Sequence, residues 1–347
     1  MIKEFDLIRA QARLHHAYLL GLQLMVSVNK EPSLIEKWMF RLFRRQHEEK
    51  FLSSFEKLGL NELPDAVACA QYHVLSNSLG GVGVEYMAET KQKAWVRFRY
   101  PRWMYYGPAI CGLPKEVGHG FLKGWYAHNG VSLQNPNLGF VCVSEDMTGE
   151  FGFCGYFQEY DRELSEGERL CFAKDEVPPQ FVQADQPMAP DAKWNEERKV
   201  KANRNYSVEF IRNALIALAD VVGKDEAQKL GSRAAKLIGL QYFQETRAMI
   251  GTEDGDLQSA AQYLCLMFRG MGDDVEIAST QDSHKIQLIH SGLRIVRDLE
   301  DANRDIVLNC WRQLWFGALS SYREIKYLRL ERQTNELHWT ISQIANH

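Results

Sequence analysis

The chain lacks most of the features that identify secreted and membrane proteins. Its seven cysteines are spread widely and irregularly over 347 residues, which is not the pattern of a disulfide framework. The apolar stretch nearest the N-terminus, AYLLGLQLMVSV, is too short to span a bilayer and has no small-residue cleavage site. These absences predict a cytoplasmic protein with reduced thiols and no membrane partner.

The commonest catalytic and cofactor-binding motifs are also missing. There is no glycine-rich phosphate loop, no dinucleotide fingerprint, no nucleophile elbow and no HExxH zinc motif. The net charge is −4, so the chain as a whole does not attract nucleic acid. We therefore expect neither a nucleotide cofactor nor a nucleic-acid partner. The content of 45% hydrophobic and 25% charged residues is that of a folded globular protein.

The most informative feature that is present is an internal repeat. AQYHVLSNSLGGVGVEY, from Ala70, aligns without a gap with AQYLCLMFRGMGDDVEI, from Ala261. Further matches follow five residues out of step, beginning with Trp125 and Trp311. Because the matching pairs keep the same order over most of both halves, the sequence predicts a duplicated domain.

Each half has the same predicted succession of elements. Stretches with helical spacing of apolar residues end at glycine, and a strand pair, a further helix and a closing hairpin follow. This succession predicts an α+β fold of two duplicated domains, each with helices packed on an antiparallel sheet. The predicted ranges are an N-terminal helix over 1–30, a first domain with the functional pocket over 31–172, a linker rich in proline and charge over 173–204, and a degenerate second copy over 205–347.

Two cysteines flank a pair of acids in VCVSEDMTGEFGFC, residues 141–154. One interpretation is a β-hairpin in which Cys142 and Cys154 are small buried fillers. The other is a metal or reactive site that includes Glu145 or Asp146. We favour buried, metal-free thiols and keep zinc as the alternative.

The stretch GHGFLKGWYAHNGVSLQNPNLGFVCVSEDMTGEFGFC resembles the vinyl-reductase-like, hydrocarbon-binding domain. That domain is also the sensor module of bacterial phenol-responsive transcription activators, and L-2-amino-thiazoline-4-carboxylate hydrolases are more distantly similar. The resemblance covers about the central third of each half. In the sensor modules cysteines and an acid bind structural zinc, which implies Cys111, Cys142, Asp146 and Cys154 as ligands here. Asp146 departs from the pattern, because it stands eight residues before Cys154 where the family has cysteine.

Arginine alternates with aromatic residues in RFRYPRWMYYG, residues 97–107. Strand alternation places Arg97 and Arg99 on one face, so they are either solvated side chains or a clamp for a substrate carboxylate. A stacking surface for single-stranded nucleic acid is a further alternative, which the negative net charge disfavours. The clamp predicts a small anionic ligand, with Trp103 beside it.

Histidines are candidates for proton transfer near neutral pH. His119 lies between two glycines at a helix start, and His73 follows the repeated AQY where the second half has Leu264. The second half also has Leu288 at the position aligned with Arg97. Drift and ordinary core packing are the alternatives at each position. The predicted catalytic residues are His119, His73 and Glu145, and the predicted ligand-binding residues are Arg97, Arg99, Trp103, Tyr72, Trp125 and His128.

These features predict a protein that encloses a small organic molecule in its first domain. The leading prediction is a hydrolase or lyase acting on a small aromatic or heterocyclic carboxylic acid. The alternative is a non-catalytic carrier or sensor of a small hydrophobic ligand. The amphipathic segment 294–319 is either a supported surface helix or the face of a homodimer, and the acids of GDDVEI are expected in a solvated turn.

Overall fold

The computed structural model describes residues 4–99, 113–145, 152–190, 194–253, 255–278, 280, 282–322, 325–333 and 336–343. The chain divides into two compact units, here called the first unit, Ser27–Lys199, and the second unit, Met1–Val26 with Val200–His347. Each unit combines helices with one sheet, so the predicted α+β fold is confirmed. None of the described helices is long and apolar enough to cross a membrane.

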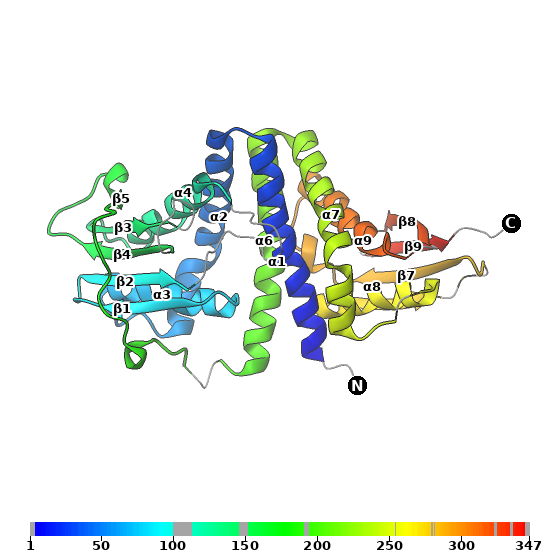
Figure 1. Cartoon of the computed structure of the whole chain (residues 1–347), viewed down its shortest axis with the longest axis horizontal. Coiled ribbons are helices and arrows are strands. Elements are labelled where there is room, and N and C mark those ends of the chain that lie inside the picture. The colour runs from blue at the N-terminus through cyan, green and yellow to red at the C-terminus, as the bar shows by residue number, and fades with distance from the viewer. Residues whose placement is uncertain are drawn as a thin grey trace. The chain divides into compact units, whose positions relative to one another are not determined.

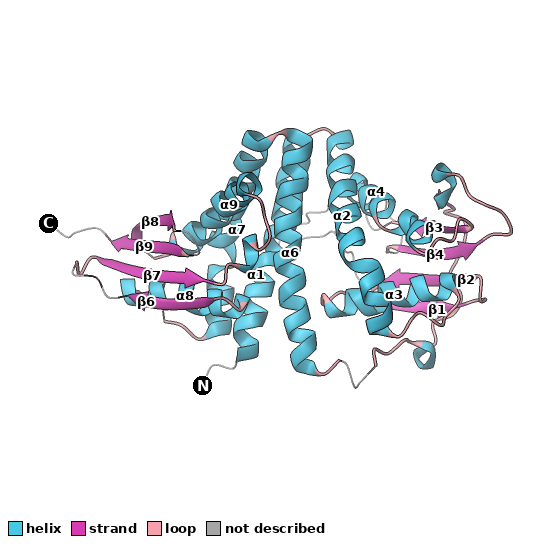
Figure 2. Ribbon diagram, turned by 180° about the vertical axis from the view of Figure 1, so that it is seen from behind, coloured by secondary structure: helices cyan, strands magenta, loops and turns pink. Residues whose placement is uncertain are grey.

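The first unit is built around a five-stranded sheet in the order β1-β2-β4-β3-β5 (Figures 1 and 2). Neighbouring strands are antiparallel except β3 and β5, which pair in parallel. Its main elements are α2 (Pro32–Leu58), α3 (Asp65–Leu79), β1 (Val84–Ala88), β2 (Lys93–Phe98), α4 (Lys115–Gly124), η1 (Tyr126–His128), α5 (Asn129–Ser132), β3 (Leu138–Ser144), β4 (Cys154–Glu159), η3 (Glu166–Arg169), β5 (Leu170–Phe172) and η4 (Gln183–Asp185).

The second unit contains a four-stranded antiparallel sheet in the order β6-β7-β9-β8. Its elements are α1 (Glu4–Asn29), α6 (Glu196–Val222), α7 (Lys224–Ile250), α8 (Leu257–Met271), β6 (Asp274–Ala278), β7 (Lys285–Ser291), η5 (Arg294–Val296), α9 (Asp301–Leu319), β8 (Ile325–Arg332) and β9 (Leu337–Gln343). The last residues of α1 and the first residues of α6 are assigned to the first unit, although most of each helix belongs to the second.

The duplication is visible in the order of elements and in the order of strands. In each unit a 27-residue helix and a 15-residue helix precede two strands, a further helix and two more strands. The strands lie in the order first, second, fourth, third in both sheets. The predicted pair of duplicated domains is therefore confirmed, and β5 is an addition to the first sheet.

The sheet registers correct one of the aligned positions. Glu85 pairs with Arg97 in the first sheet, and the matching Glu276 pairs with Ile289 in the second. The counterpart of Arg97 is therefore Ile289 and not Leu288. The reason is one additional residue between the paired positions in the β6–β7 hairpin, which a gapless alignment cannot include.

The domain division differs from the predicted ranges at both ends of the first unit. Helix α1 packs within the second unit, where the Tyr18 hydroxyl donates to Gly231 O at 3.0 Å and Trp311 Nε1 donates to His15 Nε2 at 3.1 Å. The expected linker over 173–204 is also not free. Its first part lies on the first sheet, and α6 begins at Glu196. Prolines prevent a regular helix over the first part but do not prevent packing.

The two sheets differ on the face that points away from α3 and α8. In the first sheet this outer face is apolar and buried, with Met87, Trp95, Val141 and Tyr156 in one cluster. Residues 173–186, here called the strap, cross it, and Ala173 and Phe181 pack against the cluster. By register, the corresponding residues of the second sheet are Ala278, Gln287, Arg329 and Thr340, all partly or fully exposed.

Candidate functional site

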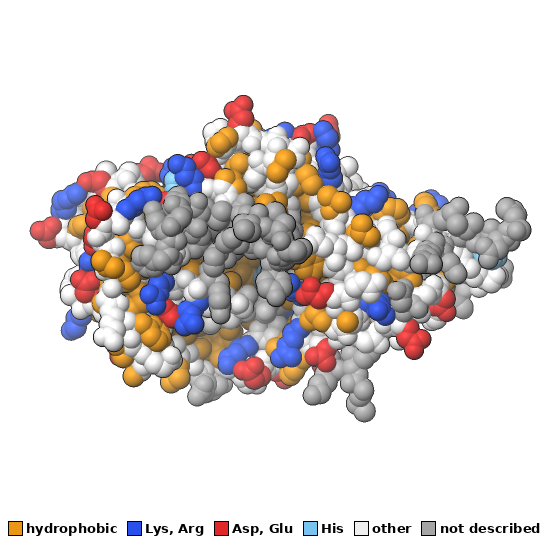
Figure 3. Space-filling model, viewed as in Figure 1, with side chains coloured by type: hydrophobic (Ala, Val, Ile, Leu, Met, Phe, Trp, Pro, Cys, Tyr) orange, Lys and Arg blue, Asp and Glu red, His pale blue; other side chains and the backbone are white. Residues whose placement is uncertain are grey.

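The first unit has a pocket of about 380 Å³ between its helices and the β5 edge of the sheet. That volume is within the range of small-molecule sites. Basic, acidic and hydrophobic side chains are interspersed on the face of this unit that Figure 3 shows. The lining residues are Phe40 and Arg44 of α2, Lys123 of α4, Ala127 and His128 of η1, Val131 of α5, Glu166, Gly167 and Arg169 of η3, and Leu170 and Phe172 of β5.

Two glycines allow α4 to approach α2 closely enough to form one side of the pocket. A Cβ atom on Gly120 would lie 2.5 Å from Glu36 O, and one on Gly124 would lie 2.6 Å from Phe40 O. Arg44 Nε donates to Gly124 O at 3.0 Å, which ties the arginine of α2 to the end of α4. The spacing of glycines in GHGFLKG therefore places Arg44 and Lys123 at the same pocket.

The pocket is positively charged. Arg44, Lys123 and Arg169 line it together with one acid, Glu166. Lys123 also contacts Glu36 outside the lining. Burial, followed by the charges of Arg44 and Arg169, lowers the pKa of His128 to about 4. His128 is therefore neutral at physiological pH, and the arginines carry the positive charge that an anionic ligand would meet.

His119 lies beside the pocket wall with an acid partner. Its ring centroid is 5.1 Å from that of Phe172, and it precedes Lys123 by one helical turn on the same face of α4. Nε2 lies 2.8 Å from Glu145 Oε1, which is an ion-pair distance, but the angle is not that of a ring N–H hydrogen bond. The structure thus brings together the predicted catalytic residues His119 and Glu145.

The predicted arginine clamp holds a carboxylate of the chain itself. Arg97 Nε donates to Glu85 Oε2 at 2.8 Å, and Arg99 Nη1 donates to Glu85 Oε1 at 2.8 Å. The Glu85 side chain is 7% exposed, whereas those of Arg97 and Arg99 are 33% and 55% exposed. These arginines lie on the outer face of the sheet and do not line the pocket. Their role in ligand binding stays a prediction.

His73, Tyr72 and Trp125 lie in the aromatic core and not on the pocket wall. His73 is 2% exposed, its ring stacks on Tyr126 with centroids 3.9 Å apart, and its Nε2 lies 3.0 Å from Asn129 Nδ2. Tyr72 and Trp125 are also buried. The core reaches the pocket through His47, which the sequence analysis did not identify. Its ring is 5.6 Å from Trp125 and 5.1 Å from His128.

The predicted metal ligands do not meet among the described residues. Cys142 pairs with Gly155 in the sheet, so the neighbouring Cys154 points to the opposite face, where it joins the outer cluster. Both thiols are buried, and burial raises the pKa of Cys154 to about 12. One ion does not reach both sulfur atoms in this arrangement.

Three predicted residues, Cys111, Asp146 and Trp103, fall outside the described part of the chain. Within the described part, no group of three or more His, Cys, Asp or Glu side chains is arranged to hold a metal ion. Zinc binding stays a prediction.

The second unit contains a buried histidine–aspartate pair that differs from expectation. Asp273, expected in a solvated turn, is 4% exposed, and its Oδ2 lies 2.9 Å from His290 Nε2. Trp339 Nε1 donates to His290 Nδ1 at 3.2 Å, so the ring proton lies on Nε2 and is donated to the carboxylate. The pair is fully enclosed, which suits a structural role.

The basic pocket residues that the sequence analysis missed are Arg44, Lys123 and Arg169. They come from three segments that are far apart in the sequence, and the sequence around each of them is that of an ordinary surface residue. The one local signal was the small-residue spacing of α4, which indicates a close helix contact. Comparison of the chain with protein-family models, with curated proteins and with solved structures found no match in any of the three.

Proposed function

We propose that the first unit binds a small organic acid in the pocket between α2, α4 and β5, and that the protein is a hydrolase or lyase acting on this acid. One observation carries the proposal. Three basic side chains line a pocket that also has apolar walls, and a histidine with an acid partner lies on the same helix face as one of them. Apolar walls with a few convergent polar groups are typical of small-molecule sites.

The pocket residues suggest distinct roles for its two kinds of wall. Arg44 and Arg169 would hold the carboxylate, because a guanidinium matches it with two parallel hydrogen bonds. Phe40 and Phe172 would flank an aromatic or heterocyclic ring. His119 would move the proton, and Glu145, 2.8 Å from its Nε2 atom, would hold the ring in place.

A non-catalytic carrier or sensor is the second candidate, and one observation favours it. The Nε2 atom of His119 is not aligned for a hydrogen bond to Glu145, so its proton-transfer geometry is incomplete in this state. The same pocket and the same ligand class would serve both functions.

The experiment measures binding and turnover separately on a panel of small aromatic and heterocyclic carboxylic acids and their amides. We expect Arg169→Ala to weaken binding of the acids by about 10- to 150-fold, the range for a hydrogen bond to a charged group. Arg329→Ala is the matched control, since Arg329 is an exposed arginine of the second sheet. Calorimetry measures affinity, and mass spectrometry measures product.

His119→Gln distinguishes the two candidate functions. A lower turnover with nearly unchanged affinity supports the enzyme, and a lower affinity with no turnover in any variant supports the carrier. If no acid on the panel binds, or if Arg169→Ala binds as tightly as the wild type, the pocket is not the site we propose.

A further inference from the structure

The strap crosses the whole outer face of the first sheet. It follows directly from β5, where Ala173 N donates to Cys142 O at 3.0 Å. At the far edge Gln186 completes β1: its Nε2 donates to Tyr86 O at 2.7 Å, and its Oε1 accepts from Tyr86 N at 3.0 Å. A glutamine side chain thus takes the place of a neighbouring strand at one position of this edge.

The strap covers the side chains of the sheet, whereas its own residues stay largely exposed to solvent. The six side chains of the outer cluster are each 6% exposed or less, and they belong to Met87, Trp95, Val141, Val143, Cys154 and Tyr156. Every residue from 173 to 186 is partly or fully exposed, and Val177 is 74% exposed. A segment with few buried apolar contacts of its own has a low free energy of local opening.

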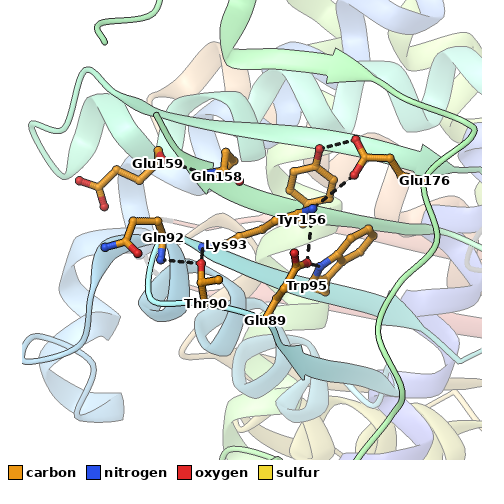
Figure 4. Close-up of polar contacts among 9 residues, drawn as sticks. All are labelled: Glu89, Thr90, Gln92, Lys93, Trp95, Tyr156, Gln158, Glu159 and Glu176. Carbon is orange, nitrogen blue, oxygen red and sulfur yellow. Dashed lines mark hydrogen bonds and ion pairs between the residues drawn. The ribbon is translucent and has the colours of Figure 1, made fainter. Parts of the chain in front are cut away.

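A polar cluster fastens the middle of the strap to the sheet. Lys93 Nζ lies 3.3 Å from Glu176 of the strap and 3.3 Å from Glu89 at the end of the β1–β2 hairpin. The same ammonium group lies 4.2 Å from the ring centroid of Tyr156 and 5.0 Å from that of Trp95. The Tyr156 hydroxyl donates to Glu176 Oε1 at 2.7 Å. Figure 4 shows the contacts that join these residues.

Lys93 is the centre of this cluster, here called the clasp and defined by Glu89, Lys93, Trp95, Tyr156 and Glu176. Its ammonium group pairs with two carboxylates and lies over two aromatic faces, and both kinds of contact depend on its charge. By register, Lys285 is the matching residue of the second sheet, where the side chain is 51% exposed and pairs with Asp282. Lys93 and Lys285 therefore occupy matching positions, and only Lys93 contacts a strap, so Lys285 can serve as the control residue.

We propose that residues 173–186 are a lid that opens as a unit when the clasp around Lys93 is released, and that opening uncovers the apolar outer face of the first sheet together with the thiol of Cys154. The lid continues without a break from Phe172, so its opening also acts on a side chain of the pocket wall. The opening itself does not depend on the identity of the ligand.

The two buried cysteines of the first sheet allow a direct test. Cys154 belongs to the outer cluster on which the strap packs, whereas Cys142 is on the opposite face of the same strand pair. Local opening exposes Cys154 alone, and unfolding of the whole unit exposes both. The experiment follows iodoacetamide modification of the full-length protein in native buffer at one pH, with each cysteine resolved by mass spectrometry.

We expect Cys154 to react faster than Cys142 in the wild type. Lys93→Met keeps the length of the side chain and removes its charge, and it should raise the rate at Cys154 by about tenfold or more while leaving Cys142 unchanged. Tyr156→Phe removes only the hydrogen bond to Glu176 and should raise the rate at Cys154 by a smaller factor. Lys285→Met should change neither rate. Hydrogen exchange of peptides within 173–186 should accelerate in the same variants.

Three results would overturn the proposal. Equal rates at Cys154 and Cys142 in the wild type would mean that only unfolding of the whole unit exposes the outer face. Parallel acceleration at both cysteines in Lys93→Met would mean that the clasp stabilises the unit as a whole and not the strap. Wild-type rates at Cys154 in both clasp variants would mean that the clasp does not hold the strap.

Discussion

Replacing Gly120 with alanine should separate α2 from α4 and thereby damage the pocket. The added Cβ would lie 2.5 Å from both Glu36 O and Met39 Cβ, whereas ordinary contacts begin at 3.4 Å. The helices must therefore move apart by about 1 Å, and overpacking of this kind costs about 1–3 kcal/mol. Alanine recovers about 0.5–1 kcal/mol through its higher helix propensity. The difference is a net destabilisation of about 0–2.5 kcal/mol, or about 1 kcal/mol at the middle of both ranges.

Gly118 of the same helix is the matched control. Among the described residues, and apart from the neighbouring backbone of α4 itself, no atom lies within 4 Å of a Cβ added there, so Gly118→Ala should stabilise the first unit by about 0.5–1 kcal/mol. The two substitutions are chemically identical and are predicted to have opposite signs. Urea denaturation with hydrogen-exchange mass spectrometry resolves the two units and measures both values. If Gly120→Ala is as stable as Gly118→Ala, α4 does not approach α2 as described, and the placement of Lys123 at the pocket loses its basis.

Two further predictions concern charges in the first unit. Glu85→Gln should lower its stability by about 1–2 kcal/mol in urea denaturation, because Arg97 and Arg99 lose a buried acceptor and are partly compensated by solvent. Glu276→Gln, at the exposed matching position, should have almost no effect. Burial, followed by His128 and Arg44, lowers the pKa of His47 from 6.5 to about 3, so the unfolded chain takes up this proton first as the pH falls. The contribution of neutral His47 to the free energy of unfolding is therefore fully present above about pH 6.5. It should fall by about 1.4 kcal/mol per pH unit between pH 6.5 and pH 3, and His47→Gln should show a smaller slope over this range. An equal slope in wild type and variant would contradict the burial of His47.

The duplication and the α+β class were readable from the sequence because both depend on short-range patterns. The repeated AQY segments become α3 and α8, and Gly272, with φ of 83°, ends α8 in the left-handed conformation that favours glycine. The register of strand pairing in the two sheets could not be predicted from the sequence to a single residue. One additional residue in a hairpin shifts every later position, and a strand shifted by one residue exchanges its two faces.

The strand sequences do not show that the first sheet is covered on both faces. KAWVRF of β2 places Lys93, Trp95 and Arg97 on the outer face, and KIQLIHS of β7 places Lys285, Gln287, Ile289 and Ser291 there. Each outer face therefore has one apolar residue among polar ones, which is typical of a half-exposed strand. What covers the outer face was not indicated, because the strap has the composition of a linker and is attached largely by polar contacts, those of Lys93, Tyr156 and Gln186.

The sequence by itself therefore determined the elements and their duplication. Only the tertiary structure decided which faces are buried and by which partners: α1 packs within the second unit, the strap covers the first sheet, and Arg44, Lys123 and Arg169 meet at one pocket. The physical reason is the range of the interactions. Helix and strand periodicity depends on neighbours within a few residues, whereas the choice of partner depends on the free energy of burying whole faces that are distant in the chain.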